Sequence, residues 1–227
     1  MLKGYFTKWE KTLWFSSVVL ITLSFLMFDR VNYLKFIASL IGTTSLIFIA
    51  KGNPIGQLLM MIFGMIYGYI SYSYAYYGEL ITYAGMTAPM SLMSLFSWLK
   101  NPYKGNRAQV KISRVTKKDV ALMLVLSIVV TVVLYFVLKH FGTANLIPST
   151  FSVTTSFVAV FLSFKRSPYF ALSYAVNDIV LIILWTLAVL EDVSYVSVLV
   201  CFVVFLANDM YSFINWRKIR ARQTDDK

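Results

Sequence analysis

Long apolar runs separated by short polar segments fill the chain from end to end. Gly, Pro and charged residues divide it into runs of about 20 residues, the length that a helix needs to cross a hydrocarbon core. The runs lie near residues 10–28, 31–50, 57–77, 79–98, 119–139, 149–165, 168–190 and 193–216. The sixth run is the shortest, and Pro148 and Pro168 bracket it. The pattern predicts an all-α integral membrane protein with about eight transmembrane helices.

Basic residues fall on alternate connections between these runs. One side receives the N-terminus, Lys51, the 99–118 loop, Lys165-Arg166 and the tail from residue 217. The other side receives Asp29-Arg30, Glu79, the 140–147 stretch and Glu191-Asp192, with Lys139 as a mild exception. Because Lys and Arg stay on the cytoplasmic side, we expect an inner-membrane protein with both termini in the cytoplasm. Seven helices would place the N-terminal lysines outside, which this pattern disfavours.

Composition excludes several other classes. Hydrophobic residues make up 59% of the 227 residues and charged residues only 14%, so a water-soluble fold is excluded. The net charge of +11 is split into blocks between apolar runs, which indicates membrane topology and no nucleic-acid partner. One Cys, Cys201, and one His, His140, allow no disulfide framework and no His/Cys metal cluster, and we expect no cofactor. The first run lacks a small-x-small cleavage site, so it is interpreted as a retained helix.

An internal repeat joins the two halves of the chain. The segment from Ser94 to Lys100 matches the segment from Ser212 to Lys218 in its spacing of Ser, aromatic, Trp and Lys, and Lys51-Gly-Asn-Pro54 resembles Lys165-Arg-Ser-Pro168. The prediction is an extra N-terminal helix at 1–30, triple-helix repeats at 31–98 and 140–216, a basic loop and linker helix at 99–139, and a basic tail at 217–227. Because a single helix links the two triplets, both triplets start on the same side of the membrane and the repeats are parallel. Parallel triple-helix repeats are one known transporter architecture. The alternative is that Trp and Lys simply end helices at the membrane interface.

One acidic residue lies deep in a predicted span. Counting from Pro168 at ~1.5 Å per residue places Asp178 roughly 15 Å into the core, near its midplane. A carboxylate there is costly unless it faces a polar cavity, which favours a functional role, although an Asp capped by a neighbouring hydroxyl for packing is the alternative. Tyr174, Asn177 and Trp185 lie on or beside the same helical stripe.

Polar candidates also occur on two other predicted helices. On the last one, Asn208 and Tyr211 share a face, which either lines the same pathway or anchors the helix at headgroup level. On the third one, Asn53, Gln57 and Tyr67 are candidates for lining, with structural roles as the alternative. The third helix also carries a Gly64-x-x-x-Gly68 pattern typical of close helix packing. Pro89 predicts a bend in the fourth helix.

Aromatic rings beside a buried carboxylate suit an organic cation or a flat heterocycle. The sequence contains no Ser/His/Asp set, no phosphate-binding Gly loop and no nucleotide motif, which favours binding over turnover. A carrier is therefore the first hypothesis. A membrane-embedded enzyme and a sensor or scaffold that transports nothing are the alternatives, and an ion-coupled carrier stays open because an intramembrane Asp can carry a proton.

Several motifs resemble the PnuC family of vitamin transporters. They are Lys51-Gly-Asn-Pro-Ile-Gly-Gln57, Tyr67-Gly-Tyr-Ile-Ser-Tyr72, Tyr77-Gly-Glu-Leu-Ile-Thr-Tyr83, Pro89 and Ser97-Trp-Leu-Lys-Asn-Pro-Tyr103. The resemblance covers about residues 31–218. It implies a three-plus-one-plus-three helix core related to the SWEET sugar transporters, sometimes with an extra N-terminal helix.

The resemblance also implies a function. It implies uptake of nicotinamide riboside by facilitated diffusion, with a cytoplasmic kinase trapping the product. Trp185 and Tyr174 would then face the pyridinium ring, and Asn53, Gln57 and Asn177 the ribose. Members of this family also carry thiamine or riboflavin, and the Val176-Asn177-Asp178-Ile179 run departs from the pattern of the nicotinamide riboside carriers. Substrate identity and any homo-oligomer are therefore left open.

Overall fold

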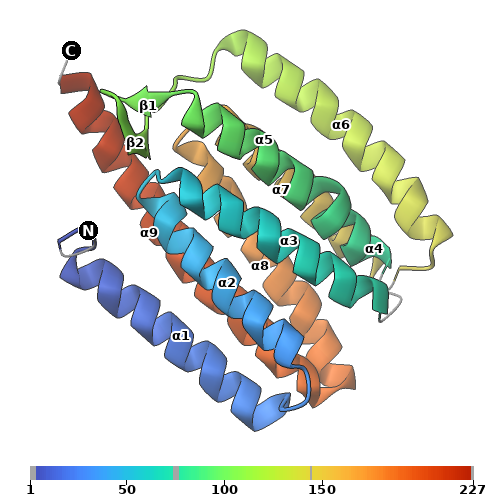
Figure 1. The fold of residues 1–227 in the computed structure, drawn as a ribbon. Coiled ribbons are helices and arrows are strands. Elements are labelled where there is room, and N and C mark those ends of the chain that lie inside the picture. The colour runs from blue at the N-terminus through green and yellow to red at the C-terminus, as the bar shows by residue number, and fades with distance from the viewer. Residues whose placement is uncertain (1–3, 74–76, 144, 226–227) are drawn as a thin grey trace.

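A computed structural model of the chain, which describes residues 4–73, 77–143 and 145–225, is a bundle of long helices (Figure 1). The elements in chain order are α1 Lys8–Phe28, α2 Tyr33–Ala50, α3 Pro54–Ser73, α4 Tyr77–Leu80, a π-helical segment η1 Ile81–Thr87, α5 Ala88–Leu99, β1 Pro102–Tyr103, β2 Asn106–Val110, α6 Lys117–His140, α7 Leu146–Phe164, α8 Tyr169–Glu191, a 3-10 turn η2 Val193–Tyr195 and α9 Val196–Asp225. Each predicted run corresponds to one crossing, with α4, η1 and α5 together forming the fourth. The small antiparallel hairpin β1-β2 was not predicted.

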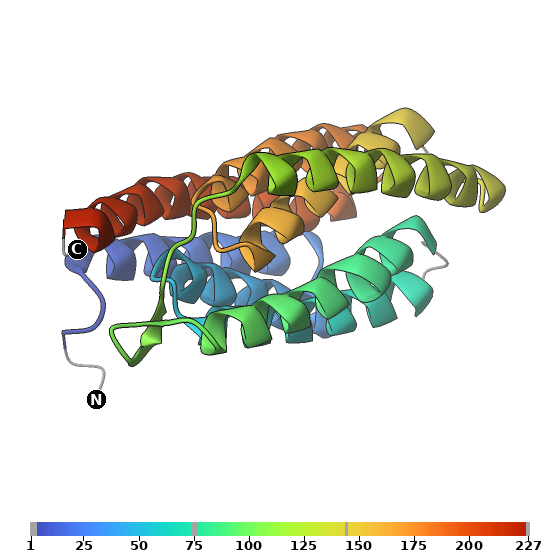
Figure 2. The ribbon, with the colours of Figure 1, turned by 90° about the horizontal axis from the view of Figure 1, so that it is seen from above.

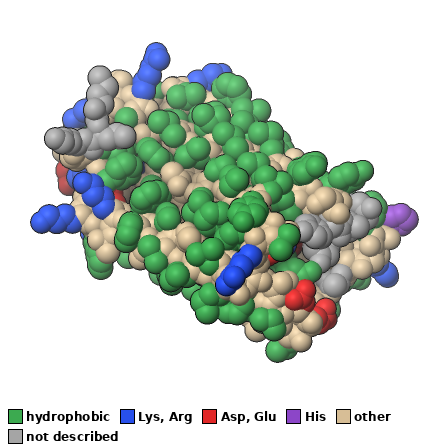
Figure 3. Space-filling view, turned by 60° about the horizontal axis from the view of Figure 1, so that its bottom comes forward, with side chains coloured by type: hydrophobic (Ala, Val, Ile, Leu, Met, Phe, Trp, Pro, Cys, Tyr) green, Lys and Arg blue, Asp and Glu red, His purple; other side chains and the backbone are tan. Residues whose placement is uncertain are grey.

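The surface between the two ends of the bundle is apolar. Seven helices among the described residues are long and apolar enough to cross a membrane, and the fourth crossing is not among them because η1 divides it. Figure 3 shows hydrophobic side chains covering the middle of one face, with several Lys and Arg side chains at one end. Helix α6 is the most apolar of the seven and few of its residues are fully buried, because it lies at the edge of the bundle and packs mainly on α7. The chain is an all-α membrane protein.

Connections gather at two chemically different ends of the bundle. The first end, here called the basic end, contains the start of α1, the α2-α3 turn, the β1-β2 hairpin, the α7-α8 turn and the end of α9 (Figure 1). The opposite end, here called the acidic end, contains the α1-α2 and α8-η2 connections, the end of α3, the start of α4, the end of α6 and the start of α7, with Asp29, Glu79 and Glu191. This alternation of charge agrees with the sequence pattern.

Two parallel triple-helix halves form the core. Helices α2, α3 and the fourth crossing make one half, helices α7, α8 and α9 make the other, and α6 links them. Figure 2 shows the halves as two layers, with α1 beside α2 in one layer and α6 beside α7 in the other. Helix α1 lies outside both halves and packs on α2 and α9. The residue boundaries given above for the repeats stay predictions.

Equivalent turns follow the first helix of each half. The N–H of Gly52 donates to the Ile49 carbonyl at 2.8 Å, and the N–H of Arg166 donates to the Ser163 carbonyl at 2.9 Å. Gly52 and Arg166 both have positive φ, 69° and 56°. A glycine takes this conformation freely, whereas an arginine there costs roughly 1–2 kcal/mol. Both turns are therefore built to the same plan at positions that the sequence repeat pairs.

A reciprocal contact ties the two halves together at the basic end. The Trp98 Nε1 donates to the Ser163 carbonyl at 2.9 Å, and the Trp216 Nε1 donates to the Ile49 carbonyl at 2.8 Å. The indole of each half thus contacts the first helix of the other half. Both indoles are 0% exposed, and their ring centroids are 5.2 Å apart. We call these two indoles with their two carbonyls the tryptophan clasp.

Neighbouring side chains repeat this exchange. The Ser97 hydroxyl donates to the Phe164 carbonyl at 2.8 Å, and the Asn215 amide donates to the Ala50 carbonyl at 2.8 Å. These are the last carbonyls of α7 and α2, which have no partner within their own helices. The helix ends that the other half covers are therefore satisfied by side chains of that half.

Close backbone packing confirms the small-residue pattern on α3. A Cβ at Gly68 would lie 2.6 Å from the Ala84 Cβ, and one at Gly64 would lie 3.1 Å from the Tyr83 carbonyl oxygen. The bend predicted from Pro89 stays a prediction, and the fourth crossing contains the π-helical segment η1, which ends at Thr87 just before Ala88 and the proline. Proline cannot donate a backbone hydrogen bond, and a wider turn at the start of α5 accommodates that loss.

Replacing Gly56 with Ala is expected to destabilise the protein. A Cβ there would lie 2.6 Å from the Ile49 backbone nitrogen and 2.8 Å from the Ser45 carbonyl oxygen, which are backbone atoms that cannot rotate away. The expected loss is about 1–3 kcal/mol, seen as a lower unfolding temperature in detergent. Gly85→Ala is the matched control, because its nearest contact is the Ile81 Cγ2 at 3.8 Å. Equal melting of the two variants would contradict the packing described.

Candidate transport cavity between the two halves

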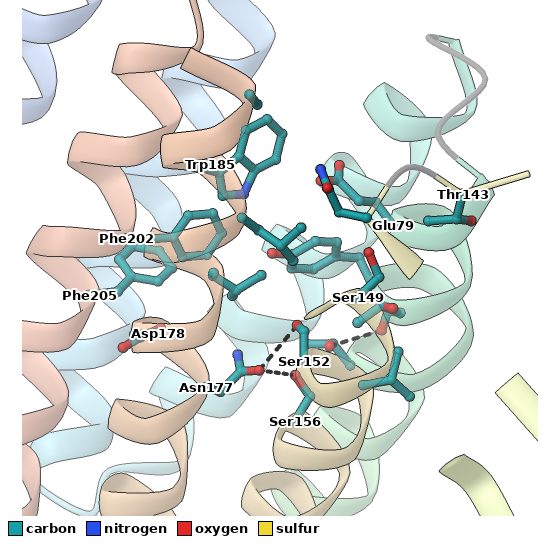
Figure 4. A pocket seen from close by; sticks show the side chains of 18 of the residues that line it. Glu79, Thr143, Ser149, Ser152, Ser156, Asn177, Asp178, Trp185, Phe202 and Phe205 are labelled. Atoms are coloured by element: carbon teal, nitrogen blue, oxygen red, sulfur yellow. Dashed lines mark hydrogen bonds between the residues drawn. The ribbon is translucent and has the colours of Figure 1, made fainter. Parts of the chain in front are cut away.

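A cavity of about 390 Å³ lies between the two halves. Its lining comes from α2, α3, the fourth crossing and the α6-α7 connection on one side, and from α7, α8, η2 and α9 on the other. It extends from Thr143, Asn145 and Glu191 at the acidic end down to Tyr174, which lies about one turn inside α8. Figure 4 shows Trp185, Phe202 and Asn177 facing Glu79, Ser149 and Thr143 across this space.

Asn177 is held by hydroxyl groups of α7. Its Oδ1 accepts from Ser152 at 3.2 Å, from Thr155 at 2.8 Å and from Ser156 at 3.0 Å. Three donors on one oxygen fix the amide plane and turn its NH₂ group away from α7 (Figure 4). The NH₂ group is therefore a fixed donor available to a ligand hydroxyl or carbonyl.

Aromatic rings form much of the rest of the wall. Trp185 lies parallel to Phe202, with an interplanar angle of 14° and ring centroids 6.4 Å apart, and it is tilted against Tyr195 at 5.4 Å. Across the cavity, Tyr83 packs edge-on against Phe63 at 5.8 Å. Ring faces stack on planar heterocycles and attract cations. The wall is therefore suited to a flat ring that carries positive charge.

The charged side chains that line the cavity are all acidic among the described residues. They are Glu79, Asp178, Glu191 and Asp209, and no Lys, Arg or His of the described chain lines it. The whole chain has 21 Lys and Arg residues but only ten Asp and Glu residues. The negative charge of the cavity is therefore opposite in sign to the net charge of the protein. An interior of this charge attracts cations and repels phosphate groups.

Two of these carboxyl groups form a pair. Asp178 of α8 and Asp209 of α9 line the same wall of the cavity, and they are 3% and 2% exposed. The Asp178 Oδ2 and the Asp209 Oδ1 have no hydrogen-bond partner among the described residues. Such buried acceptors are costly when they are left empty, and they make this wall of the cavity a place for a polar or cationic ligand.

Four of the nine sequence candidates line the cavity. Tyr174, Asn177, Asp178 and Trp185 lie along one side of α8. Tyr67 lies behind the wall, where its ring packs against Tyr83 at 4.6 Å. Gln57 lies nearer the basic end, and its amide donates to the Ser163 hydroxyl at 3.1 Å across the two halves.

The remaining three candidates face away from the cavity. The Asn208 amide donates to Ser17 of α1 at 3.1 Å, and the Tyr211 hydroxyl donates to Glu10 of α1 at 2.9 Å. Asn53 caps α3, and its amide also donates to Tyr5 at 3.0 Å. The shared face predicted on the last helix is real, but it packs against α1. Because successive residues are ~100° apart around a helix, it is the adjoining Asp209 that reaches the cavity.

Sequence reasoning passed over several lining residues. Glu79 and Glu191 were assigned to connections on charge pattern alone, yet both line the mouth of the cavity. The hydroxyl groups that hold Asn177 repeat at i, i+3 and i+4 inside an otherwise apolar run, and that spacing was the available signal. Phe202 and Phe205 gave no signal, because aromatic residues occur throughout the spans. No group of three or more metal-binding side chains occurs in the part of the chain that the structure describes.

Aromatic rings close the cavity toward the basic end. Below Tyr174 lies Phe170, whose ring centroid is 6.2 Å from that of Tyr174 and 4.8 Å from that of Trp216. Phe170 and the two indoles of the tryptophan clasp are fully buried. The cavity therefore reaches the acidic end and is shut off from the basic end.

Comparison with known proteins places this architecture in a family. Residues 32–218 match the family described as nicotinamide mononucleotide transporter. The chain belongs to the nicotinamide mononucleotide transporter family. The match begins where α2 does, so α1 stands outside the part that defines this family.

Two relatives of this transporter family match nearly the whole chain. The nicotinamide riboside transporter PnuC of Neisseria mucosa (strain ATCC 25996 / DSM 4631 / NCTC 10774 / M26) is 28% identical over 203 residues, which are 87% of this chain and 77% of that protein. The crystal structure of the vitamin B3 transporter PnuC superposes with a TM-score of 0.82 at 26% identity and covers 96% of this chain and 94% of that one. The helical membrane fold predicted from the sequence is confirmed.

Replacing either clasp indole with phenylalanine is expected to lower stability. Trp98→Phe and Trp216→Phe each remove a buried hydrogen bond and part of a buried ring, for a loss of roughly 1–3 kcal/mol measured by thermal unfolding in detergent. Trp14→Phe is the control, because the Trp14 Nε1 donates to Thr44 at 3.2 Å but its side chain is 37% exposed. If Trp14→Phe lowers the unfolding temperature as much as the two clasp variants do, the clasp does not hold the halves together.

Proposed function

We propose that this chain transports nicotinamide riboside into the cell. The observation that carries the proposal is the cavity, in which four carboxyl groups and an aromatic wall occur without one basic side chain. Nicotinamide riboside is a pyridinium cation with ribose hydroxyls and no phosphate. Its ring suits the Trp185 wall, and its hydroxyls suit the Asn177 amide and the neighbouring serines. The name of the Neisseria relative supports the same substrate.

The negative charge of the cavity is expected to discriminate between nicotinamide riboside and its phosphorylated form. Nicotinamide mononucleotide carries the same ring, but its phosphate would enter a cavity that offers no Lys or Arg to balance it. The proposed selectivity is therefore for the riboside. Thiamine is the second candidate, because it is also a cation with flat rings. Riboflavin has no positive ring and gains nothing from the carboxyl groups.

The arrangement of the halves supports alternating access. The cavity reaches the acidic end, and the tryptophan clasp closes the basic end. Because both clasp hydrogen bonds join one half to the other, rocking of the halves would break them and open the basic end. We propose the inner membrane as location, with the basic end and both termini in the cytoplasm. In this scheme transport is facilitated diffusion, the protein performs no chemical step, and a cytoplasmic kinase traps the substrate.

A ligand panel tests the substrate. Nicotinamide riboside, nicotinamide mononucleotide, thiamine and riboflavin are titrated against the purified protein by calorimetry, and uptake is then measured in liposomes. We expect the riboside to bind tightest and its uptake to be the same with and without a pH gradient. Tighter binding of the mononucleotide would overturn the electrostatic argument. Uptake only with a pH gradient would replace facilitation by proton coupling.

Removing charge from the cavity is expected to weaken binding. Asp178→Asn and Glu79→Gln keep the size of the side chain but remove a carboxyl group that faces a cationic ligand, and each is expected to weaken riboside binding by roughly tenfold or more. Asp192→Asn is the matched control. Asp192 lies next to Glu191 but not in the cavity lining, and its carboxylate accepts from the Ser194 backbone N–H.

Two outcomes separate the possible roles of Asp178. Wild-type affinity in Asp178→Asn, with normal folding, would remove Asp178 from the binding site. An equal loss in Asp192→Asn would show that the general negative charge of the acidic end, and not the cavity, sets affinity.

A further inference from the structure

A second cavity, of about 480 Å³, lies at the basic end and is separate from the transport cavity. It is enclosed by the start of α1, the β1-β2 hairpin and the last turns of α9, and its lining includes Lys51 at the α2-α3 turn. None of its lining residues contributes to the transport cavity. Tyr211, which the sequence pattern singled out, lies here.

Cationic side chains converge on this second cavity. Lys218 and Arg222 are one helical turn apart on α9, and both line it and are exposed. Neither takes part in an ion pair among the described residues, where the paired bases are Lys35, Lys51 and Lys165. In the described part of the chain, neither of these two positive charges is ion-paired with a carboxylate.

The single acidic residue in the lining is fully engaged. Glu10 is 1% exposed, and its carboxylate accepts from the Thr7 backbone N–H at 2.7 Å and from the Tyr211 hydroxyl at 2.9 Å. Lys51 completes the set at 3.2 Å and balances the charge of Glu10. Glu10 is thus neutralised within its own cluster, and Lys218 and Arg222 keep their full attraction for an added anion.

Neutral donors and an apolar rim complete the cavity. Asn106, Gln109 and Asn215 line it, and the Tyr5 hydroxyl donates to the Ala108 carbonyl at 3.4 Å. Burial raises the pKa of the Tyr5 hydroxyl, so it stays protonated there. At the rim, Trp9 is 74% exposed and Ile214 is 50% exposed. An exposed Trp beside basic residues at a helix end is typical of the headgroup level of a membrane.

We propose that this second cavity binds a phosphate group, held by Lys218 and Arg222, from an anionic lipid headgroup or a soluble phosphate. Arg presents a planar set of donors to phosphate oxygens and Lys adds a point charge. Four separate parts of the chain build the cavity, namely the start of α1, Lys51 at the α2-α3 turn, the hairpin and α9. A phosphate bound there lies between α1 and the transporter core at the basic end.

The test compares two sources of phosphate on the purified full-length protein. One arm measures retention of phosphatidylglycerol against phosphatidylcholine by native mass spectrometry, together with the shift that each lipid causes in the unfolding temperature. The other arm measures the shift caused by inorganic phosphate against chloride at equal ionic strength. Stabilisation by phosphatidylglycerol alone identifies a lipid site, and stabilisation by inorganic phosphate identifies a site open to soluble phosphate.

Charge removal locates the effect. Lys218→Gln with Arg222→Gln is expected to weaken phosphate or phosphatidylglycerol binding by roughly an order of magnitude or more, because each cation near an anionic surface contributes to affinity. Lys117→Gln with Lys118→Gln removes the same charge from an exposed site at the basic end that does not line the cavity. This control is expected to bind like the wild type.

The proposal is overturned if neither phosphate source stabilises the wild type, or if both double variants lose binding equally. Riboside uptake is measured alongside for both double variants. Because Lys218 and Arg222 lie outside the transport cavity, riboside binding by the Lys218→Gln, Arg222→Gln variant is expected to stay at the wild-type value. Failure of the transport proposal therefore leaves this test intact.

Discussion

Satisfaction of backbone carbonyls where the two halves meet is the constraint on which this structure depends. Helices α2 and α7 end at the basic end with carbonyls that their own helices leave unpaired, at a place that the other half covers. Ser97 and Asn215 supply the missing donors, and Trp98 and Trp216 add a second hydrogen bond one residue earlier. Because each donor comes from the opposite half, neither half is complete alone, and any opening at this end must break these bonds together.

Charged residues are distributed unevenly over the structure, whereas the contacts between the two halves are symmetric. The basic residues gather at one end of the bundle, and the transport cavity takes four of the ten acidic residues and none of the basic ones. A cation that enters from the acidic end meets carboxyl groups and ring faces, whereas an anion meets only repulsion. At the basic end Lys218 and Arg222 reverse this preference. In the proposed scheme, a cationic vitamin and a phosphate group therefore bind at separate places in the protein.

The extra helix α1 connects these two regions through α9. Asn208 and Tyr211 bind α1, while Asp209, between them, faces the transport cavity. Different sides of α9 therefore contact α1, which lies outside the family match, and the transport cavity.

Hydropathy and charge periodicity determined the crossings and their alternation, because each depends on residues close together in the chain. The parallel repeat was predicted from matching motifs in the two halves, Ser94–Lys100 with Ser212–Lys218. Helical periodicity also placed Asp178, Asn177, Tyr174 and Trp185 on one stripe, since a single helix sets that spacing. Only the tertiary structure decided which helix faced that stripe. It paired Asp178 with Asp209 and Asn177 with the α7 hydroxyls, and it turned Asn208 and Tyr211 toward α1, because the rotation of one helix against another is set by packing between residues far apart in sequence.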